Sequence, residues 1–207
     1  MARRPVLTAY GGLALADALL AASGNRRARR LTKSALMPLL AARVASTEDN
    51  DGTRTLVLAG LGMSWAGDVA LLGEGDAAFR AGLGSFLVAH LCYLGALGKV
   101  RRGGVRRRPV IALAYVVAWC VLNRLLWPRT GKLRLPVIVY GTALAAMALA
   151  ALDTENPKVA AGGALFMASD SILALRTFEA ATIPGADALV MLTYTAAQAL
   201  IADGLTA

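Results

Sequence analysis

Two aspartates occur in matching contexts inside apolar stretches of this 207-residue chain, about a hundred positions apart. Asp68 ends the run Trp-Ala-Gly-Asp and Asp170 ends the run Met-Ala-Ser-Asp, and a leucine follows each of them three residues later. An aspartate at the centre of a membrane-spanning helix costs about 2.5–3.5 kcal/mol, so such residues usually serve a function. The two acids are therefore the first candidates for chemistry.

Two carboxyl groups at one site can divide an acid–base task between them. In a shared, partly dry pocket one carboxyl can hold a proton while the other stays ionised. Such a pair suits general acid–base catalysis, with Asp68 and Asp170 as the catalytic residues. The alternative is structural: the acids would bond to Ser64, Ser169 or neighbouring helices and fix the packing.

Other polar side chains occur at helical spacings. His90 and Tyr93 are separated by three residues, and Tyr194 and Gln198 by four, so each pair lies on one face of a helix. Tyr140 lies in a further apolar stretch. These residues either line a site together with the acids or form ordinary hydrogen bonds between helices.

Three cations, Lys33, Arg124 and Arg176, fall near the ends of apolar stretches. A long basic side chain at such a position often extends to the membrane surface with no further role. As a set on the side of the acids, these residues could instead hold a phosphate group.

The sequence argues against several kinds of site. It contains one histidine, so a zinc site with three histidines is impossible, and a site made of carboxylates alone is weakly supported. It has no serine-nucleophile motif, glycine-rich phosphate loop or Cys-x-x-Cys motif. Cys92 and Cys120 fall in apolar stretches, where we expect small buried hydrophobic residues and no disulfide framework. We therefore expect neither a metal nor a cofactor.

The elements that must carry these residues are membrane-spanning helices. The chain is 57% hydrophobic with a mean hydropathy of +0.57, and its apolar runs approach the roughly 20 residues that cross a bilayer. The pattern predicts an all-α, multi-pass membrane protein with one helical-bundle domain over residues 1–207, in the cell membrane if the source is bacterial. The eight predicted spans are residues 5–22, 31–46, 55–72, 79–100, 110–127, 133–152, 159–178 and 186–202.

Eight spans place both ends of the chain on one side, face A, and leave face B opposite. Asp68 and Asp170 lie four and eight residues from the face B ends of their predicted spans, roughly 6 and 12 Å deep at the rise of an α-helix. Asp17 lies at a comparable depth in the first span. The acids are therefore predicted near the glycerol layer of the membrane.

The formal net charge of +9 lies mainly in short connectors, including RRARR and RRGGVRRR. Beside membrane spans, such clusters usually meet lipid phosphates, so nucleic acid is not an expected partner. The 22 Lys and Arg divide as eleven near each face, so charge does not orient the chain.

The similar contexts of the two acids also suggest a parallel internal repeat of four helices plus four, or a coincidence between alanine-rich helices.

The motifs in their order resemble the YhhN-like lysoplasmalogenase family of small eight-helix membrane proteins. The pieces that carry the resemblance cover residues 55 to the end; they are GLGMSWAGDVALL, FRAGLGSFLVAHLCYL, PVIVYGTALAAMALA, GGALFMASDSILALRTF and MLTYTAAQALI. The second span departs from the family pattern, because Thr32-Lys33-Ser34 stands where the family resembles Thr-Lys-Pro.

The resemblance implies hydrolysis of the vinyl ether bond of lysoplasmalogens to a fatty aldehyde and a glycerophospho-headgroup. It maps Asp68 and Asp170 onto the two acids thought to be catalytic, and a lysophospholipid and bilayer lipids become the expected partners. The side chains expected to bind the substrate are Ser64, His90, Tyr93, Tyr140, Ser169, Tyr194, Gln198, Lys33, Arg124 and Arg176.

Two other functions fit paired acids in a membrane. A proton-coupled transporter of small solutes would use them near the midplane with access from both faces, which the predicted depth disfavours. A lipid-binding or scaffold protein would use them only for packing.

Hydrolysis requires an acid still protonated near neutral pH and a nearby carboxylate, as in glycosidases. Asp170, the deeper of the two, is the favoured acid.

Overall fold

The computed structural model describes residues 3–48 and 51–207, and every regular element in these residues is helical. Eight long helices account for the fold, joined by one short helix, α5 (Gly104–Arg107), and one 3₁₀ turn, η1 (Gly131–Leu133). The long helices are α1 (Arg3–Ala22), α2 (Arg26–Ala45), α3 (Thr53–Ala70), α4 (Gly75–Gly98), α6 (Pro109–Leu126), α7 (Arg134–Asp153), α8 (Pro157–Thr177) and α9 (Ala186–Thr206).

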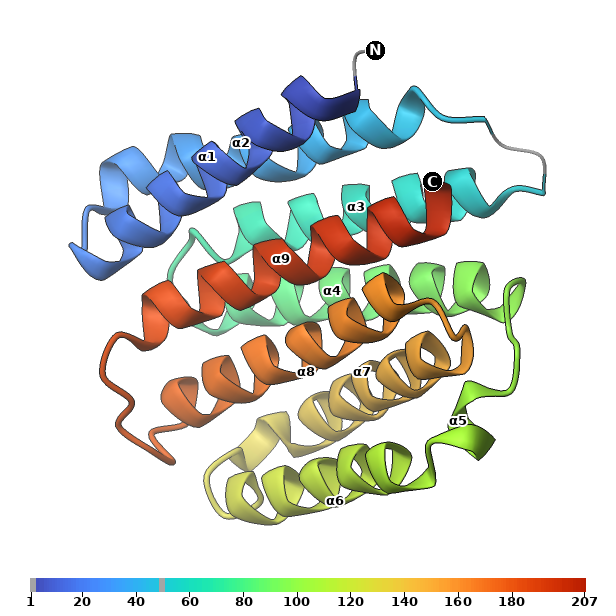
Figure 1. Ribbon diagram of the computed structural model, residues 1–207. Helices are drawn as coiled ribbons and strands as arrows, with labels where there is room; N and C mark the ends of the chain where they lie inside the picture. The colour runs from blue at the N-terminus through green and yellow to red at the C-terminus, as the bar shows by residue number, and fades with distance from the viewer. Residues whose placement is uncertain (1–2, 49–50) are drawn as a thin grey trace.

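The long helices lie side by side, with α1 and α2 at one edge of the bundle and α6 at the other (Figure 1). The most extensive contacts join α3 to α4 and α8 to α9, and α9 also meets α1. Helix α6 packs mainly on α7. The two ends of the chain lie at the same end of the bundle, face A of the sequence analysis (Figure 1).

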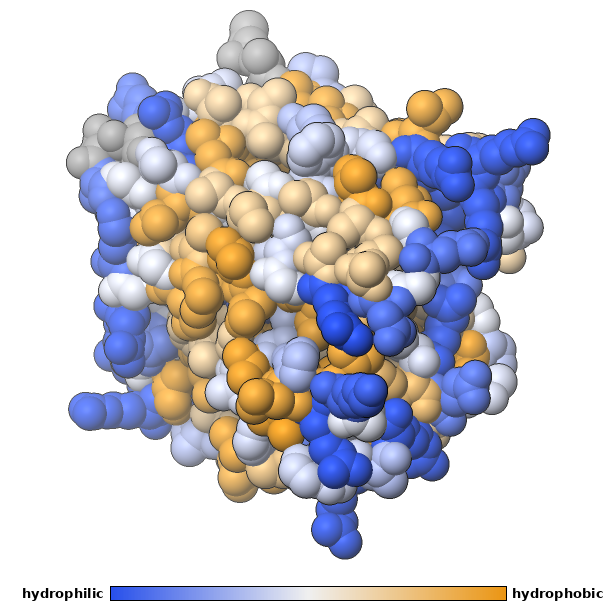
Figure 2. All heavy atoms as spheres, turned by 180° about the vertical axis from the view of Figure 1, so that it is seen from behind, coloured by the Kyte–Doolittle hydropathy of each residue, from blue (hydrophilic) through white to orange (hydrophobic). Residues whose placement is uncertain are grey.

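The surface matches a protein that spans a membrane. Figure 2 shows an apolar belt between two ends where hydrophilic side chains gather. Six helices are long and apolar enough to cross a bilayer, namely α1, α4, α6, α7 together with η1, α8 and α9. The chain is thus a multi-pass integral membrane protein. The predicted all-helical membrane fold is confirmed, with six helices apolar enough to span the membrane. That eight helices cross the membrane, and that they form a repeat of four plus four, remain predictions.

Helix α2 begins earlier than the sequence analysis predicted. Arg26 to Arg30 were assigned to a connector, but they form the first turns of the helix because the side chain of Asn25 accepts a hydrogen bond from the backbone N–H of Ala28. The basic cluster therefore lies on a helix at face B. This polar start also explains why α2 falls short of the hydropathy of a simple span.

Small residues let the central helices approach closely enough to bury polar side chains. A Cβ at Gly60 would lie 2.5 Å from the Tyr93 ring, and one at Gly67 would lie 2.7 Å from the Phe86 ring. At the contact of α8 with α9, a Cβ at Gly162 would meet Ile201 at 2.7 Å. The absence of side chains at these positions thus sets the spacing of the helices that carry the acids.

The two cysteines are free and differ in exposure. Cys92 is half-buried, whereas Cys120 is exposed on the outer side of α6. The expectation of burial is therefore wrong for Cys120, because α6 is an edge helix that contacts few neighbours and its apolar residues face outward.

Candidate active site

Asp170 lies in a polar cluster made by three helices. The hydroxyl of Tyr140 on α7 donates a hydrogen bond to Oδ2 of Asp170 on α8. Nε2 of His90, on α4, lies 3.1 Å from that hydroxyl and 3.9 Å from the same carboxylate oxygen. The His90 side chain is fully buried, and its Nδ1 has no hydrogen-bond partner among the described residues. The cluster therefore couples the acid to two groups that can carry a proton.

Two narrow cavities flank this cluster, and both are lined by Asp170 and Tyr140. One, of about 60 Å³, lies between α4, α7 and α8, and most of its lining is apolar. The other, of about 40 Å³, lies between α6, α7 and α8 and adds the polar groups of Trp119, Asn123 and Ser171. The Asp170 side chain, 11% exposed, is thus accessible from two sides.

Asp68 lies in a second cluster, in which it is fully paired. Nζ of Lys33, on α2, lies 3.2 Å from Oδ1, and the hydroxyl of Tyr194 on α9 donates to Oδ2 at 2.8 Å. The Asp68 side chain is 2% exposed and the Lys33 side chain 11%. Both carboxylate oxygens therefore have a donor, and the charge of the acid is balanced inside the bundle.

The second cluster continues one helical turn deeper. Gln198 accepts a hydrogen bond from the hydroxyl of Tyr93 at 2.5 Å and donates to the hydroxyl of Ser64 at 2.9 Å. Ser64 and Asp68 are four residues apart on α3, and Tyr194 and Gln198 are four apart on α9. Because residues four apart share a helix face, α3 and α9 face each other through two layers of polar contacts.

Asp17 extends the second cluster toward face B. It is fully buried on α1, accepts a hydrogen bond from the Thr32 hydroxyl at 2.5 Å and lies 3.8 Å from Nε of Arg29. The depth of Asp17 was predicted from the sequence, but these partners were not. The spacing of Arg29 and Lys33 could have indicated them, because residues four apart share one face of a helix. In the structure each of these two cations meets an acid on a neighbouring helix.

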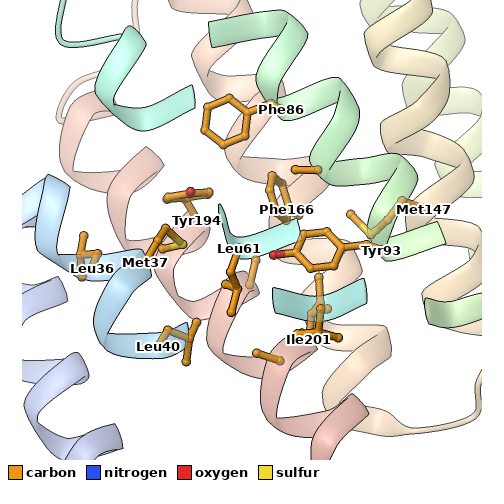
Figure 3. Packing of buried hydrophobic residues seen from close by; sticks show 14 of the residues in the cluster. Leu36, Met37, Leu40, Leu61, Phe86, Tyr93, Met147, Phe166, Tyr194 and Ile201 are labelled. Atoms are coloured by element: carbon orange, nitrogen blue, oxygen red, sulfur yellow. The ribbon is translucent and has the colours of Figure 1, made fainter. Parts of the chain in front are cut away.

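Aromatic rings separate the two clusters. Figure 3 shows Phe86, Phe166 and Tyr194 gathered in the interior. The ring of Phe166 lies 5.5 Å from that of Tyr194 and 4.8 Å from that of His90, centroid to centroid. Asp68 and Asp170 thus have different hydrogen-bond partners on opposite sides of a phenylalanine. The expected arrangement, two carboxyls sharing one hydrogen in one cavity, does not describe this geometry.

Three other predicted site residues lie outside both clusters. The Ser169 hydroxyl donates to the backbone oxygen of Val190 at 3.1 Å, which ties α8 to α9. Arg176 pairs with Asp187 at 2.6 Å at face B. Arg124 is exposed near the end of α6. The remaining predicted residues lie in one cluster or the other; they are Ser64, His90, Tyr93, Tyr140, Tyr194, Gln198 and Lys33.

Metal coordination has no obvious place in the part of the chain that the structure describes. No group of three or more His, Cys, Asp or Glu side chains is positioned there to hold an ion. The donors around each acid are instead tyrosine hydroxyls, a lysine and a histidine.

The fold and the clusters define a polytopic helical membrane protein with two buried aspartates below one face. Residues 28–205 match the YhhN family, and the chain belongs to this family. It is 40% identical over 139 residues to a lysoplasmalogenase of Mycobacterium tuberculosis, an alignment that covers 61% of this chain and 51% of the relative.

Human relatives are also similar. The chain is 34% identical over 151 residues to human lysoplasmalogenase TMEM86B, covering 72% of this chain and 63% of that protein. It is 32% identical over 154 residues to human lysoplasmalogenase TMEM86A. The alignments thus span about half of the mycobacterial relatives and under two thirds of the human ones. No solved structure matches the chain.

Proposed function

We propose that this protein is a lysoplasmalogenase, which hydrolyses the vinyl ether bond of alkenyl-glycerophosphoethanolamine or -choline. The family and the names of its relatives support this function. The observation that carries it is the position of Asp170, accessible from two cavities and in contact with Tyr140 beside His90. We also propose that residues 1–207 form one domain in which all eight long helices, including α2 and α3, cross the membrane.

In the first step, Asp170 delivers a proton to the vinyl carbon remote from the ether oxygen. This forms a C–H bond, and the double-bond electrons leave an oxocarbenium ion at the carbon attached to oxygen. Tyr140 contacts Oδ2, so Oδ1 is the oxygen left to carry the proton. Apolar side chains make up most of the lining of the larger of the two cavities, so a vinyl ether can lie against Asp170 there with little water around it.

In the second step, water adds to the oxocarbenium carbon. The Asp170 carboxylate takes a proton from this water and is thereby restored, and a hemiacetal is formed. Collapse of the hemiacetal breaks the bond between its carbon and the former ether oxygen, which leaves as the glycerol hydroxyl, and the fatty aldehyde remains. Tyr140 and His90 hold Asp170 in position and can carry protons during this collapse.

Asp68 is proposed as the second acid in a different role. Nζ of Lys33 lies 3.2 Å from Oδ1 of Asp68, so this acid has a cation beside it. Asp68 lines neither of the cavities beside Asp170. Its negative charge would stabilise the cationic intermediate from behind the aromatic rings, since charges act over longer distances in an apolar interior than in water.

The test is release of aldehyde from a lysoplasmenyl lipid by the purified protein in detergent, where a transporter shows no turnover because no compartment exists. We expect Asp170→Asn to lower kcat by about 10²–10⁴-fold, the range of a lost general acid. Asp68→Asn should also abolish most activity. Asp76→Asn, which removes an exposed carboxyl at face B, is the control. Near-normal turnover by Asp170→Asn would refute the mechanism.

A further inference from the structure

We propose that the lysolipid lies along the cleft between α6 and α7 and reaches it sideways from the bilayer, with its phosphate at Arg124 and its vinyl ether against Asp170. This inference rests on the proposed function and assigns the substrate to one of the two sides from which Asp170 is accessible. The carrying observation is that two hollows along α6, one beside Asp170 and one open toward face B, share two of their lining residues.

The two hollows share part of their lining. The cavity of about 40 Å³ beside Asp170 is lined on α6 by Trp119 and Asn123. The same two residues line an open groove of about 650 Å³ that continues past Arg124 and Arg129 toward face B. Trp119 and Asn123 thus stand between the groove and Asp170, and in the proposed path the lysolipid passes these two side chains.

Polar groups in the middle of this path suit a glycerol or phosphate oxygen. Nε1 of Trp119 is buried and has no hydrogen-bond partner among the described residues. Nδ2 of Asn123 donates to the backbone oxygen of Trp119 at 2.8 Å, which leaves its second N–H and its oxygen available. A buried donor without a partner is costly, so a ligand that accepts a hydrogen bond there is favoured.

Only one of the three predicted phosphate-binding cations remains free for a ligand. Lys33 is paired with Asp68 and Arg176 with Asp187. In the described part of the chain Arg124 makes no hydrogen bond or ion pair. Along α6, Arg124 lies five residues above Trp119, about 7.5 Å toward face B at the rise of an α-helix. That distance matches the few bonds between a lysolipid's phosphate and its vinyl ether.

The deep end of the path suits an alkyl chain. On the face A side of Asp170 the cavity is lined by Met167, three residues before Asp170 on α8, and by Leu144, four residues after Tyr140 on α7. Helix α6 is at the edge of the bundle and only 6% of its span is buried, so the bilayer reaches it directly. A lysolipid from the face B leaflet would thus keep its natural orientation, with the headgroup at the surface and the chain pointing inward.

The first test blocks the cleft. Gly141 on α7 faces Trp119 and Asn123, and a Cβ there would lie 3.7 Å from Nε1 of Trp119. In the Gly141→Leu variant the new Cβ should fit without a clash, and the remaining side-chain atoms should fill the cleft. We expect at least tenfold weaker binding of a saturated 1-alkyl-glycerophosphoethanolamine, which lacks the cleavable double bond. Gly84→Leu, where a Cβ would meet no atom within 4 Å, should bind normally.

The second test removes the proposed phosphate contact. We expect Arg124→Gln to weaken binding of the same alkyl lysolipid about tenfold but to leave binding of 1-alkylglycerol, which has no phosphate, unchanged. Arg30→Gln removes the same charge from face B at the far edge of the bundle and should change neither. Melting temperatures would establish that each variant is folded.

Each outcome decides between the two hypotheses. Wild-type affinity in both Gly141→Leu and Arg124→Gln would overturn the path between α6 and α7. Equal loss of both ligands in Arg124→Gln would overturn the phosphate contact. If the binding results are as expected but the wild-type protein releases no aldehyde from a vinyl ether lysolipid, the path stands and the proposed hydrolysis is wrong.

Discussion

Asp68 and Asp170 have similar sequence neighbours but opposite surroundings. Asp68 has a lysine and a tyrosine on its two oxygens, whereas Asp170 has a tyrosine on one oxygen and cavities on either side. Lys33 therefore supplies a cation at Asp68, whereas the free side of Asp170 faces space in which a substrate can lie. The roles of the two acids therefore follow from their partners.

The ion pair between Lys33 and Asp68 makes a prediction about stability. Lys33→Met should lower the free energy of unfolding by about 3 kcal/mol, because removing one member of a buried pair leaves the other charge uncompensated. The double variant Lys33→Met/Asp68→Leu should recover most of that loss, since no charge then stays buried. Melting temperatures of the three proteins in one detergent measure the effect.

The same variants separate structure from catalysis at Asp68. If Asp68 serves only to balance Lys33, the double variant should regain activity together with stability. We expect instead that it is stable and inactive. Full activity in the double variant would show that Asp68 takes no part in the reaction.

Tyr140 gives a second prediction at the scale of single residues. Tyr140→Phe keeps the ring but removes the hydroxyl that donates to Asp170. Asp170 becomes a carboxylate as it delivers its proton, and a hydrogen bond to a charged group contributes about 1.5–3 kcal/mol, so we expect kcat to fall at least tenfold with little change in KM. Tyr115→Phe on α6 is the control. A change in KM alone would mean that Tyr140 binds substrate without orienting the acid.

Most polar residues of the two clusters could be identified from the sequence, but their pairing could not. Spacing of three or four residues shows that His90 and Tyr93 lie on neighbouring parts of one helix. It does not show that His90 meets Tyr140 on α7 while Tyr93 meets Gln198 on α9. That division depends on Phe166, which separates the clusters and is one apolar residue among many in the sequence.

At the scale of helices, hydropathy located the long segments because a span must be continuously apolar. All eight predicted segments correspond to long helices of the structure. The start of α2 was predicted too late in the chain, because its first residues are strongly basic and this charge suggested a connector. The basic residues are Arg26, Arg27, Arg29, Arg30 and Lys33. The cap at Asn25 and the acids at Asp17 and Asp68 make a helix there stable.

The glycines of α3 make a prediction about helix packing. Gly67→Ala would place a Cβ 2.7 Å from the Phe86 ring, so α3 and α4 must separate or the ring must move. We expect a loss of about 1–3 kcal/mol, the usual cost of overpacking. Gly62→Ala on the same helix meets no atom within 4 Å and should be neutral or slightly stabilising. Thermal unfolding compares the two variants.

The Phe86 ring also touches the site, so Gly67→Ala has a second expected effect. Phe86 lines the apolar cavity beside Asp170 and lies 5.9 Å from the Tyr194 ring. A displaced ring should therefore lower activity at temperatures where the variant is still folded. Equal stability of Gly67→Ala and Gly62→Ala would contradict the close approach of α3 to α4.

At the scale of the whole molecule, composition predicted a membrane protein but left its path through the bilayer open. Basic residues divide equally between the two faces, so the usual charge bias is absent. The charged residues of α2 and α3 meet inside the bundle, where Nζ of Lys33 lies 3.2 Å from Oδ1 of Asp68. A helix whose charged residues face other helices of the bundle can cross a membrane, because the lipid does not contact those charges.

Crossing by α2 and α3 predicts opposite locations for the connectors at either end of α2. Ser23 lies between α1 and α2, and Ser46 follows α2; both are exposed. Single cysteines at these positions, in a background with Cys92→Ala and Cys120→Ala, should react differently with a membrane-impermeant thiol reagent in sealed vesicles of one orientation. One should react at once and the other only after the vesicles are opened. If α2 and α3 instead form a hairpin at the surface, both cysteines would react from the same side, and the protein would have six spans with Lys33 and Asp68 outside the membrane interior.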